Sequence, residues 1–548
     1  MSSGPRRARA TNRELLTVCE QAWTMGESAS AGVSRWRRPC PKCMILRIRN
    51  RTASSSISTS WISTPSIRWR VRLSVRFCWR YSVAAAEDHG HRHRSVHTAV
   101  TASSTPSVPS APSTASTPSA RSAVSIRSAP SAASTPSVPS APSVPTVRGP
   151  AVPDAAPEAA TQPFRSFICK VASRCNLDCD YCYVYRHADQ SWRSQPTRMS
   201  LETAAQLGRR INEHAREHGL ERVDFILHGG EPLLLGVDYL RALCETVTRA
   251  APDVRIRWNG QTNGTPYTEE VLEFCREWEV SFGLSMDGPR AVNDRHRLDH
   301  AGRSSFAQVE RCIGLLSSPE ARGLWGGILA VIDLEADPVE TYSYLRSFDP
   351  PSIDFLLPLG HHDLRPPGKE RLDVTPYADW LLRVFEMWYG ERPQPLRIRR
   401  FRDIIALYLG ATDSSEEWGL QPVDFIVVET NGEIQAVDTL KVTYPGACEL
   451  GLNIFDDSFD TALRSPLVRS RQNNWGTLGE TCRECELVRI CGGGYFPHRY
   501  SRQNGFRNES VYCADLKKLI RVVTGTVGKD LRRLAKRVEV ESDGGKAR

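Results

Sequence analysis

The 548-residue sequence predicts an α/β fold: a partial (β/α)6 barrel, followed by a small cysteine-rich domain and preceded by a disordered segment. Three observations lead to this prediction. Short β-rich runs alternate six times with amphipathic helical stretches between residues 164 and 390, which is the pattern of a parallel sheet covered by helices. Cysteines gather again after residue 480. The first 160 residues follow neither a helical nor a strand period.

The N-terminal segment, residues 1–160, is predicted to be disordered. Ser, Pro, Ala, Thr and Val make up almost all of residues 101–150, where STPSVPSAPS at 104–113 recurs unchanged at 134–143. Proline at this density removes backbone donors and fixes φ, which favours an extended chain. Residues 1–100 are basic and lack periodicity. One hypothesis is that their start was assigned too far upstream and that they are not natively translated; the alternative is a basic RNA- or membrane-binding tail.

The barrel prediction covers residues 161–395. Each expected strand is rich in β-branched and aromatic residues, and each expected helix carries apolar residues on one face. The strands are expected at 164–171, 222–229, 254–263, 280–288, 326–333 and 352–360. The helices are expected at 200–218, with Ser200 as N-cap, and at 237–250, 267–278, 304–316, 337–347 and 375–390. Active sites of such sheets lie at the carboxyl ends of the strands, so chemistry is expected in the loops that follow them.

Beyond the barrel the elements become shorter. Residues 396–522 are expected to form a bridging region and the cysteine-rich domain, and residues 523–548 a charged tail. Charge is distributed unevenly: residues 1–160 hold 21 Lys and Arg against 7 Asp and Glu, or +14, while the remainder holds 50 against 55, or −5. The body of the protein is therefore slightly acidic, which argues against nucleic-acid binding.

Sixteen cysteines require an explanation. They would form disulfides only in an exported chain, but the first 30 residues lack the continuous apolar stretch of a secretory signal. No run approaches the roughly 18 apolar residues of a membrane span. We therefore expect a cytoplasmic protein without a membrane partner, whose thiols serve metal binding or catalysis. Cys169, Cys244, Cys275 and Cys312 fall within strand or helix patterns and are expected to be buried packing residues.

The loop after the first strand reads SRCNLDCDYCYVYRH and places Cys175, Cys179 and Cys182 in C-x3-C-x2-C spacing. Three thiolates on one short loop can hold three irons of a [4Fe–4S] cluster and leave the fourth iron open. An open iron can chelate S-adenosylmethionine, and an electron from the cluster then releases a 5′-deoxyadenosyl radical. The alternative is a structural zinc ion held by the same cysteines and His187.

Three further loops carry small and polar residues at the ends of strands. HGGEP (228–232) contains two glycines, which allow a ligand to approach the backbone closely. It also contains Glu231, which can accept a hydrogen bond from an ammonium group. TNG (262–264) suits ribose or methionine contacts. SMDGP (285–289) precedes Arg297, which can pair with a carboxylate. Each could be an ordinary turn, but four such loops in order are not expected by chance.

CNLDCDYC, GGEP, TNG and SMDGP together resemble the radical S-adenosylmethionine (radical SAM) enzymes. The resemblance implies a radical SAM partial barrel in which Cys175, Cys179 and Cys182 hold the catalytic cluster. It also implies the following S-adenosylmethionine contacts: Gly229, Gly230 and Glu231 with the methionine amino group, Asn263 and Ser285 with the ribose or carboxylate side, and Arg297 with the carboxylate.

The C-terminal segment offers four more thiols: Cys482, Cys485, Cys491 and Cys513. Four thiolates can fully ligate a [4Fe–4S] cluster, which then serves electron transfer or architecture; a zinc knuckle is the alternative. The segment resembles the SPASM domain of peptide-modifying radical SAM enzymes, which often hold two auxiliary clusters. The further cysteine of that pattern would fall at Tyr495, and QAVDTLK (435–441) has no thiol. One auxiliary cluster is therefore expected.

Longer stretches resemble the Fxs-type peptide maturases, which form cyclophanes in ribosomally made precursor peptides: YVYRHADQSWR (183–193), VNDRHR (292–297), PYADWLL (376–382) and NGFRNESVYCADL (504–516). The resemblance spans residues 164–522. It implies hydrogen removal from a β-carbon of the precursor peptide, addition of that carbon to an aromatic ring, and loss of one electron and one proton. A low-potential donor such as ferredoxin or flavodoxin would supply the starting electron. His361, His362 and Asp363 are candidates for the base, although an exposed polar loop is an equal reading.

Two other functions remain open at this point. The first is oxidation of Ser or Cys to formylglycine, as in anaerobic sulfatase maturases, which use the same cluster types but usually hold two auxiliary clusters. The second is a zinc-stabilised RNA-binding protein with a basic arm, which predicts zinc in place of iron and salt-sensitive RNA binding.

Overall fold

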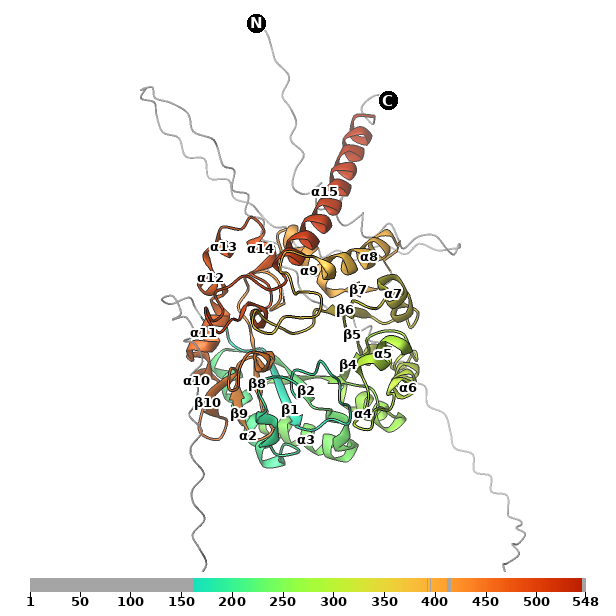
Figure 1. Cartoon of the computed structure of the whole chain (residues 1–548). Helices are drawn as coiled ribbons and strands as arrows, with labels where there is room; N and C mark the ends of the chain where they lie inside the picture. Colours follow the sequence, from blue (N-terminus) through green and yellow to red (C-terminus); the bar gives the residue numbers. More distant parts are fainter. Residues whose placement is uncertain (1–160, 392, 395, 412–414, 545–548) are drawn as a thin grey trace, which may run out of the picture. The chain divides into compact units, whose positions relative to one another are not determined.

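The computed structural model describes residues 161–544 apart from 392, 395 and 412–414. The predictions for residues 1–160, including their disorder, lie outside these described residues. Ten strands form one sheet in the order β10-β9-β8-β1-β2-β3-β4-β5-β6-β7 among the described residues (Figure 1). The strands are β1 Ser166–Ala172, β2 Arg222–Gly229, β3 Arg255–Thr262, β4 Ser281–Ser285, β5 Trp325–Val331, β6 Ser352–Leu356, β7 Arg397–Ile398, β8 Phe425–Val428, β9 Glu433–Gln435 and β10 Glu449–Asn453.

The predicted α/β fold class is confirmed. Strands β1 to β6 correspond to the six expected strands, and each pairs with the next in parallel. β1 does not close onto β6: its other edge pairs in parallel with β8, and β6 pairs with β7. The curved sheet is therefore an open barrel. β9 and β10 extend it with antiparallel pairings, so residues after 396 continue the same sheet.

The helices between the strands also match the predicted pattern. They are α2 Leu201–Glu217, α3 Val237–Ala250, α4 Glu269–Trp278, α5 Arg290–His296, α6 Phe306–Leu316, α7 Pro338–Arg346 and α8 Pro376–Gly390. Ser200 caps α2, as expected, by accepting a hydrogen bond from the backbone N–H of Thr203. One helix, α5, was not predicted. It begins directly after Pro289 and spans only two turns.

The C-terminal part consists mainly of short helices, with one long exception. They are α9 Arg399–Tyr408, α10 Phe459–Leu463, α11 Pro466–Gln472, α12 Asn474–Thr477, α13 Glu480–Arg483, α14 Val488–Cys491 and α15 Cys513–Gly544. Residues 523–544 of the predicted charged tail thus belong to α15, and α15 packs against α8 and α9. No helix in the described part of the chain has the length and apolar character to span a membrane.

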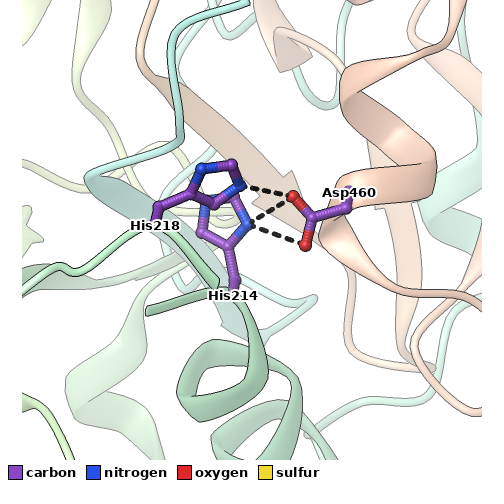
Figure 2. Close-up of side chains that lie close together, drawn as sticks. All are labelled: His214, His218 and Asp460. Carbon is purple, nitrogen blue, oxygen red and sulfur yellow. Dashed lines mark hydrogen bonds and ion pairs between the residues drawn. The ribbon is translucent and has the colours of Figure 1, made fainter. Parts of the chain in front are cut away.

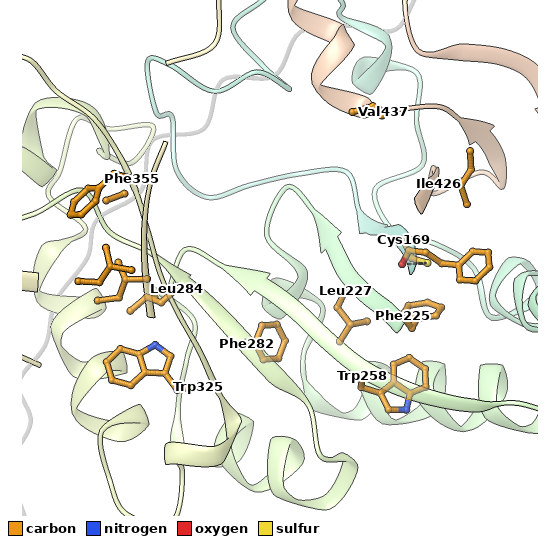
Figure 3. Packing of buried hydrophobic residues seen from close by; sticks show 14 of the residues in the cluster. Cys169, Phe225, Leu227, Trp258, Phe282, Leu284, Trp325, Phe355, Ile426 and Val437 are labelled. Atoms are coloured by element: carbon orange, nitrogen blue, oxygen red, sulfur yellow. Dashed lines mark hydrogen bonds between the residues drawn. The ribbon is translucent and has the colours of Figure 1, made fainter. Parts of the chain in front are cut away.

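Successive barrel strands each contribute a large buried aromatic side chain to the core (Figure 3). The aromatic residues are Phe225 of β2, Trp258 of β3, Phe282 of β4, Trp325 of β5 and Phe355 of β6. Parallel pairing places Phe225 beside Trp258, with ring centroids 4.8 Å apart. This packing fixes the register of the strands, and the register in turn sets where each strand ends and its loop begins.

Candidate functional site

The three cysteines of the first loop lie at the carboxyl end of β1. All three thiols are free and half-buried. A turn closed by the Cys182 N–H on the Cys179 carbonyl, 3.2 Å, draws the last two together. Burial, together with the charges of Glu231, Cys179 and Cys182, raises the pKa of the Cys175 thiol to about 12. Such a set of mutually repelling thiols deprotonates only when a metal supplies compensating positive charge, so the donor set fits an iron–sulfur cluster.

The spacing of these thiols also bears on the zinc alternative. Thiolates on one tetrahedral zinc ion lie about 3.8 Å apart, given Zn–S bonds of about 2.3 Å. Within the described ranges, the single group of three or more ligand atoms all within 4.8 Å of one another is His214, His218 and Asp460. The loop cysteines and His187 do not form such a group. Their wider spacing favours a multi-iron cluster over a single ion.

Glu231, from the loop after β2, holds three loops together. Its carboxylate accepts from the Asn263 N–H at 2.7 Å, from the Thr262 hydroxyl at 2.9 Å and from the Leu233 N–H at 3.1 Å. Burial raises the pKa of Glu231 to about 7, while these three donors oppose the shift. Since both oxygens already accept hydrogen bonds within the protein, Glu231 orients the loops. Its contact with a methionine amino group stays a prediction.

Asn263 extends this network to the cysteine loop. Its amide donates to the Asn176 side chain at 2.9 Å and lies 3.6 Å from the Cys175 sulfur. Gly229 and Gly230 are required by packing against the end of β1. A Cβ at Gly229 would lie 1.9 Å from the Ala172 carbonyl oxygen, and one at Gly230 would lie 2.2 Å from that of Arg174. The glycines therefore bring the second loop into direct contact with the first.

Arg297 occupies a buried position beside the cysteine loop and is 5% exposed. It donates to the Tyr181 hydroxyl at 2.9 Å, and Tyr181 in turn donates to Asp287 at 2.6 Å. The Nε atom of Arg297 has no hydrogen-bond partner among the described residues. A buried guanidinium with a free donor fits an anionic group such as a carboxylate. Ser285 lies apart from this chain of contacts and accepts from Gln261 at 2.8 Å.

A second polar cluster next to the same loop was not predicted. Lys170 of β1 pairs with Asp438, and the Tyr183 hydroxyl donates to Asp438 at 2.6 Å. The ammonium of Lys170 also lies 3.1 Å from His228 Nδ1. Although burial opposes it, the charge of Lys170 holds the pKa of Asp438 below its usual range, whereas burial lowers the pKa of His228 to about 3. Asp438 lies some 250 residues after Tyr183, so no local pattern could have indicated the contact.

The four C-terminal cysteines line one pocket. Cys482, Cys485, Cys491 and Cys513 lie around it together with apolar side chains such as Val488 and Leu516. Burial raises the pKa of Cys491 to about 12, so these thiols also need a metal to ionise. The structure therefore brings the four predicted ligands of an auxiliary cluster together. They come from α13, the segment between α13 and α14, the end of α14 and the start of α15.

Comparison with known proteins identifies the barrel. Residues 169–341, which include the cysteine loop and the three loops that meet it, match the family described as the radical SAM superfamily. Residues 169–341 are a radical SAM domain. The match begins in β1 and ends in α7, so it covers neither the N-terminal segment nor the four-cysteine pocket.

Similarity to curated proteins extends beyond this domain. The serine-type anaerobic sulfatase-maturating enzyme of Bacteroides thetaiotaomicron is 28% identical over 363 residues, which cover 62% of this chain and 84% of the relative. The cysteine-type enzyme of Clostridium perfringens is 25% identical and covers 65% of this chain and 95% of its own length. The solved structure of native anSMEcpe with bound AdoMet has a TM-score of 0.59 at 23% identity, covering 67% of this chain and 99% of that one, which supports the fold.

In the loop after β6, His361 is buried and His362 is half-buried, whereas Asp363 is exposed. All three nevertheless contact the C-terminal segment. His362 Nε2 lies 2.8 Å from the Glu509 carbonyl oxygen, and the Asp363 carboxylate accepts from the Arg502 N–H at 2.6 Å. His361 is buried against Tyr500. These contacts attach the loop after β6 to the segment between Cys491 and Cys513. A role as catalytic base for any of the three stays a prediction.

His214, His218 and Asp460 form a compact cluster far from the cysteine loops in sequence (Figure 2). His214 Nε2 accepts from the Phe164 N–H at 3.1 Å, so its proton resides on Nδ1 and faces Asp460. A metal on Nδ1 would move that proton to Nε2, against the Phe164 donor. The cluster is therefore better suited to joining α2 to α10 than to holding an ion.

The predicted packing role of four other cysteines is confirmed. Cys169, Cys244, Cys275 and Cys312 are each 0% exposed and belong to the core. Cys448, which lies near the C-terminal cysteines in sequence, is also fully buried, and its thiol lies 3.2 Å from the Gln435 side-chain oxygen.

Proposed function

We propose that this radical SAM enzyme crosslinks a ribosomally made precursor peptide, joining a β-carbon to an aromatic ring of the same peptide. The observation that carries the proposal is the presence of two distinct thiol sets in one fold: three on the loop after β1 and four around the C-terminal pocket. Three thiols leave an iron open for S-adenosylmethionine, and four enclose a cluster suited to receive an electron. Hydrogen removal followed by one-electron oxidation requires both.

When bound, the open cluster and S-adenosylmethionine would supply a 5′-deoxyadenosyl radical that removes one hydrogen from the peptide. The residues of the chain position the reactants. The free donor of Arg297 suits the methionine carboxylate, and the network from Glu231 through Asn263 to Asn176 keeps three loops in fixed register. Gly229, Gly230 and Ser285 complete the proposed contacts. Precise placement of this kind is the main contribution of a protein to radical chemistry.

Ring closure must end with the loss of one electron and one proton. The electron would pass to a cluster on the C-terminal cysteines. Asp438 is suited to accept the proton, because it is held ionised by Lys170 and lies beside Tyr183, which follows Cys182. A ring cation is a strong acid, so even a weakly basic carboxylate suffices. We also propose that a low-potential donor such as ferredoxin or flavodoxin supplies the starting electron and that the enzyme works in the cytoplasm.

The contacts of Tyr495 favour a single auxiliary cluster. In the SPASM pattern, this position would carry a further cysteine ligand. Here the Tyr495 hydroxyl lies 2.6 Å from the Thr439 hydroxyl and donates to Glu416 at 2.9 Å. Thr439 belongs to the segment 435–441, which has no thiol. Hydrogen bonds therefore join the two positions at which a second auxiliary cluster would need cysteine ligands.

Formylglycine formation is the second candidate, and a specific observation favours it. Curated relatives that match over 84% and 95% of their length are named serine-type and cysteine-type anaerobic sulfatase-maturating enzymes. That reaction begins in the same way, with hydrogen removal from a peptide β-carbon, and differs in the fate of the radical. In crosslinking the carbon radical adds to an aromatic ring, which then loses one electron and one proton. In formylglycine formation the radical loses one electron and the proton of its own hydroxyl or thiol, and no bond to a ring forms.

A product assay distinguishes the two candidates. The anaerobically reconstituted enzyme is incubated with S-adenosylmethionine, dithionite and a peptide that contains an aromatic-x-x triplet and a serine. A crosslink removes two hydrogens, resists fragmentation between the joined residues and does not react with a hydrazide. An aldehyde reacts with the hydrazide. A matched peptide with alanine in place of the aromatic residue should give no crosslink; a hydrazide-reactive product from both peptides would contradict the crosslinking proposal and support formylglycine.

A further inference from the structure

Arg499 is a fully buried cation without an anionic side chain to pair with. Its side chain is 0% exposed. Its guanidinium donates to the Thr477 carbonyl at 2.6 Å and to the Phe506 carbonyl at 3.0 Å, and its face lies 5.0 Å from the ring centroid of Phe496. Among the described residues, no carboxylate lies within 4.0 Å of its nitrogens, and Asn474 at 3.5 Å is neutral. Burial of an uncompensated charge is costly.

Other buried cations of the described chain provide the comparison. Five of them form an ion pair with a carboxylate, and the pairs are Lys170–Asp438, Lys369–Asp515, Lys441–Glu429, Arg400–Glu417 and Arg471–Glu416. The two that do not are Arg297 and Arg499. Arg297 lies beside Cys179 of the first loop. The fold therefore leaves a buried cation without a carboxylate at two places, and each place adjoins a set of cysteines.

Arg499 lies next to the pocket of the C-terminal cysteines. Cys482 and Cys491 lie close enough for their thiolates, once formed, to act on the charge of Arg499, as the neighbouring Arg471 also does. Gly493, which lines the pocket, is so near that a Cβ there would lie 3.6 Å from an Arg499 nitrogen. Four thiolates around a [4Fe–4S] core leave a net negative charge, and each added electron increases it. A cation buried beside such a site, in a medium of low dielectric constant, would favour the reduced form.

We propose that Arg499 is the buried counter-cation of an iron–sulfur cluster on Cys482, Cys485, Cys491 and Cys513, and that it makes this cluster easier to reduce. The inference rests on the auxiliary cluster of the proposed function. A cluster at this site would accept the electron released during ring closure more readily, because the positive charge of Arg499 would stabilise the additional negative charge of the reduced cluster. Arg499 is a positioning residue, since it acts through the cluster.

The test uses the full chain with Cys175, Cys179 and Cys182 replaced by alanine, so that the auxiliary cluster alone gives a signal. The midpoint potential is measured by redox titration monitored by electron paramagnetic resonance. Arg499→Met should shift the potential to a more negative value, whereas Arg499→Lys should retain most of the parent potential. Arg521→Met is the matched control: Arg521 lies near Cys485 but is exposed and pairs with the exposed Glu486, so solvent screens its charge and its loss should leave the potential nearly unchanged.

Iron content separates the two levels of the argument. A parent with no iron at this site would overturn both the auxiliary cluster and the role of Arg499. A parent with four irons and an Arg499→Met variant with four irons and the same potential would overturn the role of Arg499 alone.

A second readout covers a variant that binds iron poorly. The rise in melting temperature on cluster loading should be smaller in Arg499→Met than in the parent, and Arg499→Lys should restore it. If Arg499 served only to satisfy the carbonyls of Thr477 and Phe506, the Arg499→Met replacement would lower the stability of the loaded and iron-free forms equally. An equal rise in all three proteins would therefore overturn the proposal.

Discussion

If the cysteines serve two sites, as we propose, their replacement should separate two products. Alanine at Cys175, Cys179 and Cys182 should abolish cleavage of S-adenosylmethionine, because the iron with a free coordination position is lost. Alanine at Cys485 should leave reductive cleavage to 5′-deoxyadenosine with dithionite but abolish the crosslinked peptide. Both products are measured by liquid chromatography and mass spectrometry.

Loss of folding is the alternative cause that must be excluded, since a four-cysteine cluster also stabilises the protein around it. Circular dichroism and iron counts on each variant provide the control. A Cys485→Ala variant that folds, lacks the second cluster and still makes crosslinked peptide at the normal rate would contradict a catalytic part for the auxiliary cluster.

His498 should make folding stability sensitive to mild acid. It is 2% exposed, its Nε2 has no partner among the described residues, and burial lowers its pKa to about 3. Below pH of about 6.5 the unfolded chain binds a proton that the folded chain does not, so the free energy of unfolding falls as the pH falls. The loss amounts to about 1.4 kcal/mol for each pH unit until the folded pKa is reached.

Replacement of His498 by phenylalanine keeps an aromatic ring between Tyr495 and Tyr512 and removes the titration. Denaturant unfolding at pH 7.5, 6.5 and 5.5 measures the effect. The variant should lose less stability than the wild type between the last two values, by about 1 kcal/mol, because the interval begins at the unfolded pKa of about 6.5. Equal losses in the two proteins would show that His498 does not carry this dependence.

At the scale of helices and strands, the sequence predicted the barrel well. Each strand or helix has a regular spacing of apolar residues and ends at residues typical of turns. The six strands and six of the helices between them lie within a few residues of the expected ranges. β7, β9 and α5 were missed because two, three and seven residues are too short for a period to emerge. β8 was missed for another reason. It pairs with β1, where Val428 lies opposite Cys169, and a pairing between residues so far apart in sequence leaves no local pattern.

The start of α15 depends on one buried ion pair. Lys369 Nζ lies 2.6 Å from Asp515, with side chains 0% and 3% exposed. The other oxygen of Asp515 accepts from the N–H groups of Tyr377 and Ala378 at the start of α8. Asp515→Ala should cost about 3–5 kcal/mol, because it leaves a buried ammonium unpaired. Denaturant unfolding measures this change.

Asp379→Ala is the matched control for that experiment. It breaks the pair between Asp379 and Lys518, which joins the same two helices but is exposed. Loss of an exposed pair should cost less than about 1 kcal/mol. A similar cost for the two variants would mean that the buried pair does not stabilise the junction between α8 and α15.

The whole molecule shows where sequence reasoning ends. Spacing indicated both cysteine sets, because ligands of one metal site recur at short intervals along the chain. The contacts of four other residues were not predicted, since each depends on a partner distant in sequence or on burial. These residues are Tyr181, Asp287, Asp438 and Arg499. Asp287, for example, lies 106 residues from the Tyr181 hydroxyl that it binds. Tertiary packing, and not a local motif, creates these parts of the site.

Iron content tests the central claim that two four-iron clusters occupy separate cysteine sets. Anaerobically purified wild-type protein should contain about eight irons per chain. The variant with alanine at Cys175, Cys179 and Cys182 should contain about four, and so should the variant with alanine at Cys482, Cys485, Cys491 and Cys513. About four irons in the wild type, or zinc in place of iron at either set, would contradict the account.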